Sequence, residues 1–386
     1  MEARASGGGS SRSKVGAGRF RAEPLAAEGP LRVEWRAAGE MAADAPAWRG
    51  LAARALEPNV FAEPEFLGAS LQHGPVRRLS LLTVWQGPAL RGLLPITPPR
   101  APFGLGEARL WRPDLAGSGP PLIDRGDAEA VLEAMLDGLS RLGPSGAALS
   151  LPELTADGPL LTALRAVTER SRRCLALSNP SERAVLRPSL GVTDSPIGAP
   201  DAARADGGRG RFSVESAREP RAIRDAVEEF LALDARLSQA DGLPALIEQP
   251  GAALLVRTLT RELARSRRCR VDLLRSGERL AAGAITLRSG GRAWLWRIVG
   301  ERGRDGPEPV RALAQEVARA EGRRAAAITL SGPPLPASAA GVFRGRERVV
   351  DVRIATRPDA RKAAPLRRTL RRVWSGLSWR RDRAAA

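Results

Sequence analysis

The stretch from Cys269 to Gly300 reads CRVDLLRSGERLAAGAITLRSGGRAWLWRIVG, and it decides the fold. It contains three apolar runs, CRVDLL, LAAGAITLR and RAWLWRIV, rich in residues that favour strands. Ser276-Gly277 separates the first two runs, and Ser289-Gly290-Gly291 separates the last two. Short glycine-containing turns between such runs are typical of hairpins, so the pattern predicts a three-stranded antiparallel meander.

Helical patterns lie on both sides of this meander. Apolar residues recur at helical spacing in 219–237 and 251–267 before it, and in 308–322 after it. The predicted apolar face of the second of these helices holds Leu254, Leu255, Leu259 and Leu263. The runs AAAITL (325–330) and RVVDVRIAT (348–356) predict two further strands in this half of the chain.

The first half of the chain repeats this plan. Its predicted strands are residues 76–86, 90–97, 108–111, 147–151 and 173–178. Its predicted helices are residues 48–56, 64–71, 127–142 and 159–171. Both halves therefore contain an antiparallel meander, then a helix, then a strand, although they share no visible sequence repeat.

A segment rich in proline, glycine and aspartate, from about residue 179 to 210, separates the two halves. We therefore predict an α/β fold, in the wider sense α+β, with two mixed sheets flanked by helices. The predicted organisation is a disordered basic tail at 1–30, a first domain at 31–185, a linker at 186–212, a second domain at 213–358 and a basic amphipathic tail at 359–386.

The charge of the chain is unevenly distributed. The formal net charge is +18, and the residues from Arg344 onward include 14 arginines and lysines against 4 acidic residues. One apolar stripe of the tail holds Leu366, Leu370, Val373, Trp374 and Leu377. Such a basic amphipathic segment can bind an anionic membrane surface, a polysaccharide or nucleic acid, or it can simply keep the chain soluble. The aromatic content is 4 % and tyrosine is absent, which argues against nucleic acid as the partner.

The sequence also excludes several classes of protein. No run approaches the roughly 18–20 apolar residues of a membrane-spanning helix. The glycine-rich N-terminus lacks the apolar core of a secretory signal. His73 is the single histidine, and Cys174 and Cys269 lie far apart, so neither a histidine triad nor a metal site is expected. We expect a cytoplasmic protein that the tail can hold at the periphery of the inner membrane.

Short motifs follow one another between residues 45 and 330. In order, they are Trp48, Leu51, Glu57-Pro58-Asn59, Phe61, Pro64, Phe66, Pro95, Pro121 to Asp124, Ser181 to Ala184, Glu229 to Leu233, Gly283, Ser289-Gly290 and Ala293 to Arg297. In order and spacing this series resembles the landmarks of the CelD-type acetyltransferases, a GNAT family linked to bacterial cellulose biosynthesis. The resemblance implies a tandem GNAT fold, in which two acyl-CoA N-acyltransferase units follow each other.

The resemblance also implies a function. It implies an acyl-CoA-dependent N-acyltransferase, with acetyl-CoA or another acyl-CoA as co-substrate, no metal, and a small-molecule, sugar or amino-acid acceptor. In such a fold two strands splay apart, and the pantetheine arm pairs with the exposed strand edge. The pyrophosphate then binds the N-terminus of the next helix, where free amides favour an anion.

The site residues that the resemblance implies lie at the end of the meander. The catalytic candidates are Trp296, Arg297 and Glu301, with Glu301 as the candidate base. Core packing is the alternative role for Trp296, and a surface charge is the alternative for Glu301. The cofactor-binding candidates are Ile298, Val299, Arg302, Gly303, Arg304, Gly306 and Arg311.

The chain also departs from the family pattern. It contains no tyrosine, so the phenol that many GNAT enzymes use to protonate the leaving thiolate is missing. The proline-glycine pair expected at the helix start is reversed to Gly306-Pro307, and this proline removes an amide. Two alternatives to an enzyme therefore stay open. One is a catalytically degenerate GNAT-fold protein with a binding or assembly role, and the other is a basic protein that associates with surfaces through its tail.

Overall fold

The computed structural model describes residues 29–74, 79–98, 107–112, 115–117, 119–142, 147–187, 212–301, 308–330 and 341–358. Almost all of the predicted N-terminal tail, most of the predicted linker and the predicted C-terminal tail lie outside these ranges. Within them, no helix is both long and apolar enough to cross a membrane.

The first half forms the predicted strands and helices in order, together with strands β1 and β5, which were not predicted. They are β1 (Leu31–Ala37), η1 (Ala38–Ala42), α1 (Ala45–Arg54), η2 (Val60–Ala62), α2 (Pro64–His73), β2 (Ser80–Gln86), β3 (Ala89–Thr97), β4 (Ala108–Leu110), β5 (Leu122–Ile123), α3 (Ala128–Ser140), β6 (Ala148–Thr155), α4 (Pro159–Arg170) and β7 (Leu175–Leu186). The β2–β3 hairpin and both later helices confirm the sequence prediction. β7 is longer than the predicted strand and continues through residues 179–186, where we expected the chain to leave the sheet.

The second half confirms the predicted meander. Its elements are β8 (Phe212–Ala217), α6 (Pro220–Asp241), α7 (Ala252–Arg265), β9 (Cys269–Ser276), β10 (Arg279–Ser289), β11 (Arg292–Gly300), α8 (Pro309–Gly322), β12 (Ala327–Leu330) and β13 (Gly345–Ala355). β9, β10 and β11 pair antiparallel, and glycines in the left-handed conformation form the two turns between them. One detail of the α7 prediction is wrong, because Leu254 is 52 % exposed while Leu255, Leu259 and Leu263 are buried.

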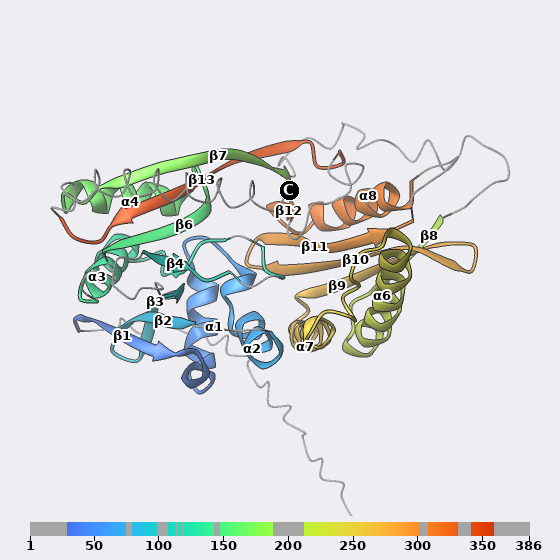
Figure 1. Ribbon diagram of the computed structural model, residues 1–386, viewed down its shortest axis with the longest axis horizontal. Helices are drawn as coiled ribbons and strands as arrows, with labels where there is room; N and C mark the ends of the chain where they lie inside the picture. The colour runs from blue at the N-terminus through green and yellow to red at the C-terminus, as the bar shows by residue number, and fades with distance from the viewer. Residues whose placement is uncertain are drawn as a thin grey trace, which may run out of the picture.

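All the strands belong to one sheet (Figure 1). The order is β1-β2-β3-β4-β6-β13-β7-β12-β11-β10-β9-β8, with β5 paired to β3. The mixed α/β class is confirmed, but the expected two separate sheets are joined. The joint is a short antiparallel pairing of β12 with β7, which aligns Ile328 with Leu186 and Thr329 with Val185.

The last strand lies far from its neighbours in sequence. β13 inserts between β6 and β7, pairing antiparallel with both. The predicted domain boundaries stay a prediction, but this strand of the predicted second domain completes the sheet of the first. In Figure 1, β13 runs beside β7 across the top of the first half.

Helices cover both faces of the sheet in the second half. α6 and α7 pack on one face, and α8 packs on the other (Figure 1). The α6 and α7 side chains form a core with the apolar residues of β9 to β11, while α8 forms a separate core on the opposite face. These cores fix the position of β11 from both sides.

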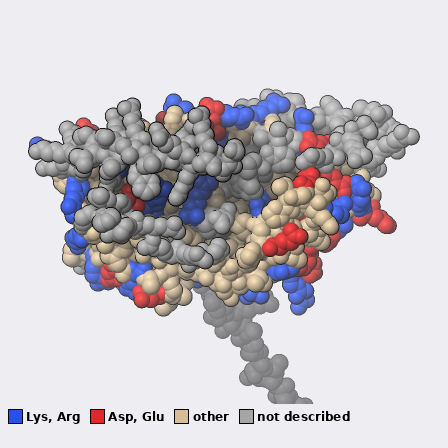
Figure 2. All heavy atoms as spheres, viewed as in Figure 1, with Lys and Arg blue, Asp and Glu red and all other residues tan. Residues whose placement is uncertain are grey.

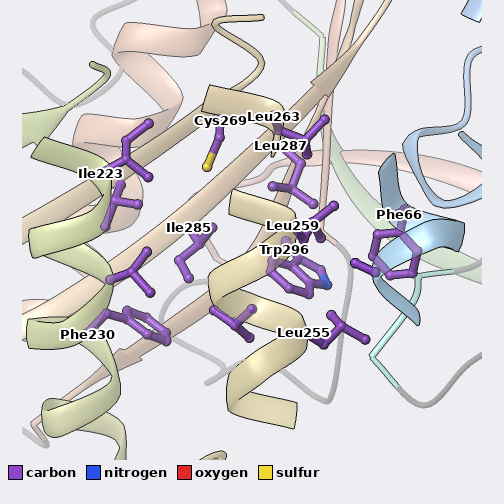
Figure 3. Close-up of a cluster of buried hydrophobic side chains, with 14 of the residues drawn as sticks. Phe66, Ile223, Phe230, Leu255, Leu259, Leu263, Cys269, Ile285, Leu287 and Trp296 are labelled. Atoms are coloured by element: carbon purple, nitrogen blue, oxygen red, sulfur yellow. The ribbon is translucent and has the colours of Figure 1, made fainter. Parts of the chain in front are cut away.

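The core beneath α6 and α7 includes residues of the first half (Figure 3). Phe66 of α2 is fully buried and lies edge-to-face with Trp296, with ring centroids 6.1 Å apart. Phe61 makes similar contacts with Phe66 at 5.0 Å and with Trp294 at 5.9 Å. The aromatic residues of the early motifs and those of the meander therefore pack together in one core.

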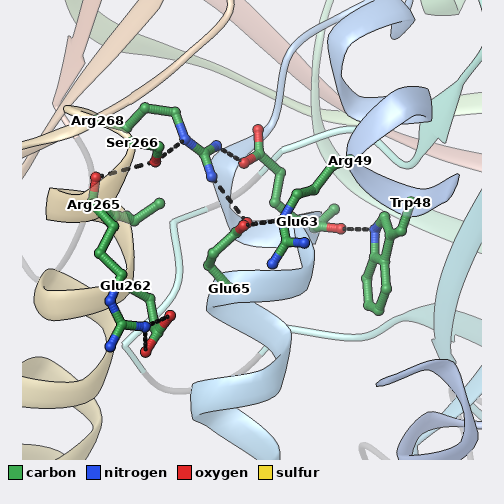
Figure 4. A network of polar contacts seen from close by, with 10 residues as sticks. Trp48, Arg49, Glu63, Glu65, Glu262, Arg265, Ser266 and Arg268 are labelled. Carbon is green, nitrogen blue, oxygen red and sulfur yellow. Dashed lines mark hydrogen bonds and ion pairs between the residues drawn. The ribbon is translucent and has the colours of Figure 1, made fainter. Parts of the chain in front are cut away.

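Ion pairs also join the two halves (Figure 4). Arg268, which precedes β9, pairs with Glu63 and with Glu65 of the first half, the latter at 2.9 Å. Burial raises the pKa of Glu63, and the nearby Arg268 opposes that shift. Ser289 of β10 also donates a hydrogen bond to Glu63. A buried carboxylate with partners from the other half holds α2 against the meander.

Candidate functional site

The strand edge of β11 is only partly paired. β11 pairs with β12 in parallel from Arg292 to Leu295, opposite Ala327 to Leu330. On its other edge, the register with β10 shifts between Ile285 and Thr286, which leaves Trp296 as an extra, bulged residue. A bulge bends the strand and increases its twist. In the part of the chain that the structure describes, residues 297–300 therefore pair with β10 alone.

The open edge presents two amide groups. The Glu301 amide donates to the carbonyl oxygen of Ala281 on β10 at 2.9 Å. Amides alternate in direction along an extended strand, so the Val299 amide also faces β10. The amides of Ile298 and Gly300 therefore face the open edge, where an added strand-like ligand can accept their hydrogen bonds.

The start of α8 lies next to this edge. Gly300 lets the helix approach, because a Cβ atom there would lie 2.6 Å from Cγ2 of Val310 and 2.8 Å from Cβ of Ala282. Glu308 is the N-cap residue of α8 and makes no side-chain cap hydrogen bond. Arg311 in the first turn is exposed. Pro309 at the first helical position has no amide N–H, so the amides of Val310 and Arg311 and the Arg311 charge are the groups that can attract an anion.

Four of the predicted cofactor-binding residues are not placed. Arg302, Gly303, Arg304 and Gly306 belong to the loop 302–307, which lies outside the described residues. The structure thus brings Ile298 and Val299 together with the α8 terminus and Arg311. Ile298 packs in the core beneath α8, and Val299 packs against the core on the opposite face.

Trp296 is a core residue in this structure. Its side chain is fully buried, and its indole N–H donates to the carbonyl oxygen of Leu115 at 2.6 Å. The indole therefore has its hydrogen-bond partner within the protein. Trp296 thus has the core-packing role that the sequence left as the alternative to a catalytic one. Ala116 and Gly117, which follow Leu115, line a small pocket formed by residues of the first half.

Arg297 follows the bulge and is only half-buried. Burial lowers the pKa of its guanidinium, and the charge of Asp234 on α6 opposes that shift. Among the described residues, no carboxylate lies within ion-pair distance of Arg297. Asp234 instead accepts a hydrogen bond from the Leu246 amide at 2.8 Å. A desolvated guanidinium without an ion pair is a candidate anion-binding group.

Glu301 has both carboxylate oxygens engaged. Oε1 accepts from Arg236 of α6 at 2.7 Å, and Oε2 accepts from Arg279 of β10. An incoming amine would have to compete with these arginines for a lone pair. Sequence reasoning missed Arg236, Arg279 and Asp234 as neighbours of the site. Of these three, only Asp234 carried a signal, because it directly follows the motif Glu229 to Leu233.

The described surface carries both signs of charge, interspersed on the face shown in Figure 2. Many arginines form ion pairs, such as Arg257 with Glu228 and Arg348 with Asp157. The described ranges contain no group of three or more histidine, cysteine or acidic residues that could hold a metal ion. The charged groups next to the open edge include Arg297, Arg311 and Glu301, which is paired with Arg236 and Arg279.

A comparison with protein families matches part of the chain. Residues 201–320 match the family model described as acetyltransferase (GNAT) domain. This segment includes the bulge, the open edge and most of α8. A search of curated protein sequences finds no match to this chain.

Solved structures resemble the whole arrangement. FemX has a TM-score of 0.51 at 8 % identity, over 83 % of this chain and 96 % of that chain. A conserved protein of unknown function from Bacteroides thetaiotaomicron VPI-5482 has a TM-score of 0.48 at 10 % identity, over 84 % of this chain and 99 % of that chain. The C-terminal domain of a putative lysylphosphatidylglycerol synthetase from Agrobacterium fabrum has a TM-score of 0.49 at 10 % identity. The match covers 81 % of this chain and 92 % of that chain. The fold of the chain is therefore similar to that of FemX, and its segment 201–320 matches the model of the GNAT acetyltransferase domain.

Proposed function

We propose that the chain is an acyl-CoA-dependent N-acyltransferase that binds its co-substrate along the open edge of β11. The observation that carries the proposal is the edge of β11 beyond Leu295, where the described pairing with β12 ends and the bulge at Trp296 follows. Within the described residues, the amides of Ile298 and Gly300 on this edge have no strand partner and can serve the pantetheine arm. The pyrophosphate would bind the first turn of α8, near Arg311.

Such a site would transfer the acyl group directly from CoA to the acceptor amine. The amine lone pair attacks the thioester carbonyl carbon, a C–N bond forms and the C–S bond breaks. The CoA thiolate leaves with the electron pair of the C–S bond and takes up the proton that the nitrogen loses. A free strand amide can donate to the oxyanion that develops on the carbonyl. The chain has no tyrosine, so that proton has to come through another group or water.

A proline substitution tests the binding mode. Ile298→Pro removes an edge amide, whereas Ile298→Ala shortens the same buried side chain and keeps the amide. We expect acetyl-CoA to bind the wild type and Ile298→Ala, and to bind Ile298→Pro about 10-fold more weakly because a strong backbone hydrogen bond is lost. Isothermal titration calorimetry with acetyl-CoA and free CoA measures this. Equal affinities for the two variants, in folded protein, would contradict the proposed pairing.

A second candidate function is binding of acyl-CoA without transfer. It is favoured by the engagement of both Glu301 oxygens by Arg236 and Arg279. Release of free thiol from acetyl-CoA in the presence of amines separates the two functions. Binding without thiol release would support the second. The link to cellulose or exopolysaccharide biosynthesis and the membrane role of the tail stay predictions from the sequence.

A further inference from the structure

The connection between α6 and α7 exposes a group of large apolar side chains. Leu243 is 61 % exposed, Ile247 is 56 % exposed and Leu254 is 52 % exposed. Among the described residues these are the three most exposed large apolar side chains, and they fall within 12 residues. We call these three residues the apolar rim. Large apolar side chains exposed this close together in the chain are candidates for contact with another molecule.

The apolar rim is held next to β11. Leu246, between Leu243 and Ile247 in sequence, is buried in the same core as Trp296. The Leu246 amide donates to Asp234, whose charge acts on Arg297. The connection is fixed internally as well, since the Ala245 amide donates to Glu248 at 3.0 Å. Leu243 and Ile247, which flank Leu246, are therefore held near Asp234, the carboxylate whose charge acts on Arg297.

Arg297 supplies the polar part of the same surface. Its guanidinium is always charged, and within the described ranges it lacks an ion pair. Arg292, five residues earlier on β11, is also desolvated but pairs with Glu347 at 2.6 Å. A half-buried guanidinium gains most from an anion that approaches from solvent, because the partner then offsets the loss of hydration.

We propose that the acyl acceptor is an amine that carries an anionic group, bound by Arg297, and an apolar part, which lies on the apolar rim. The inference rests on the proposed function, because it names the substrate class of the same open edge. Apolar amino acids have this chemistry through their carboxylate, and aminophospholipids have it through their phosphate. In either case the nitrogen attacks the thioester as described above, and Arg297 positions the acceptor without exchanging a proton.

Matched ligands test the anionic group. Leucine and leucinamide share the amine and the apolar side chain, but only leucine has a carboxylate. We expect leucine to bind the protein saturated with CoA about 10- to 100-fold more tightly than leucinamide, because a charge-assisted hydrogen bond is lost in the amide. Glycine, which lacks the apolar part, should bind more weakly than leucine. Vesicles of phosphatidylethanolamine diluted in phosphatidylcholine test the lipid source, and calorimetry and co-sedimentation are the readouts.

Matched variants test the residue. Arg297→Met should abolish the preference for leucine over leucinamide, Arg297→Lys should keep part of it, and CoA affinity should change little in both. Arg265→Met is the control, because Arg265 is 62 % exposed on α7 and pairs with Glu262. A preference that survives Arg297→Met would overturn the proposal. CoA binding without binding of any anionic amine, free or in vesicles, would overturn this inference alone. Failure of CoA and acetyl-CoA to bind would overturn the proposed function as well.

Discussion

Glu347 shows how single residues connect the two halves. It lies on β13, is 4 % exposed at its side chain, and pairs with Arg183 of β7 and Arg292 of β11. Burial alone would raise the pKa of Glu347, but Arg292 and Arg183 outweigh it and the pKa is lowered. A carboxylate with a lowered folded-state pKa stabilises the fold above its unfolded pKa, and that stability is lost as the pH falls.

We predict that Glu347→Gln lowers the free energy of unfolding by about 3 kcal/mol at pH 7, because it leaves buried arginines without their carboxylate. The difference from the wild type should shrink as the pH falls below about 4.5, the ordinary value for glutamate. Urea unfolding at several pH values measures it. Glu182→Gln is the control, because Glu182 is an exposed residue of β7, and it should change the free energy of unfolding by less than about 0.5 kcal/mol. A constant loss down to pH 3 would contradict the assignment.

At the scale of elements, the strongest local patterns were predictable and the weakest were not. The meander was evident because glycine turns separate three apolar runs. β8 was missed because most of its residues are exposed and show no alternation. The continuation of β7 was missed because Asn179 and Pro180 indicate a turn. The bulge at Trp296 has no signal in sequence because it is defined by the register with β10.

The contact of α2 with α7 supports an element-scale prediction. Gly251, the N-cap of α7, has a φ of +74°, and a Cβ atom there would lie 1.7 Å from the carbonyl oxygen of His73. The two helices are also joined by a contact of 2.9 Å between His73 Nε2 and Thr258 Oγ1. An overlap with backbone cannot be relieved by a side-chain rotation, so the helices would have to separate.

We therefore expect Gly251→Ala to lower the free energy of unfolding by about 3 kcal/mol or more. Gly277→Ala is the matched control, because Gly277 has a φ of +62° and nothing within 4 Å of the added Cβ atom. It should cost only the left-handed conformation, about 1 kcal/mol. Chemical denaturation of both variants gives the difference. Equal losses of unfolding free energy in the two variants would show that α2 and α7 can move apart at little cost.

At the scale of the whole molecule, the two halves share their structure. The early aromatic residues complete the core beneath α6 and α7, while β13 completes the sheet of the first half. Val352 and Ile354 of β13 are buried in the core formed by α3 and α4. The predicted order of elements was correct, but the sequence did not predict that each half contributes residues to the other half's core or sheet. Pairing between distant strands depends on the final packing and leaves no mark in local composition.

Deleting residues 341–386 should therefore damage the first half of the chain. We expect the amides of β6 and β7 to lose their protection from hydrogen exchange, although both strands lie far upstream of the deletion. Deleting residues 359–386 instead keeps every described strand and should leave that protection unchanged. Hydrogen exchange followed by mass spectrometry distinguishes the two truncations. Retained protection of β6 after the longer deletion would show that the first half folds without β13.

The position of β13 also constrains how the protein is made. About 160 residues separate the end of β7 from the start of β13. At the usual pace of bacterial translation, roughly 5–20 residues per second, the ribosome needs about ten to thirty seconds to add them. During that interval the nascent first half exposes unpaired edges on β6 and β7. A chaperone that shields strand edges at the tunnel exit would raise the yield of native protein.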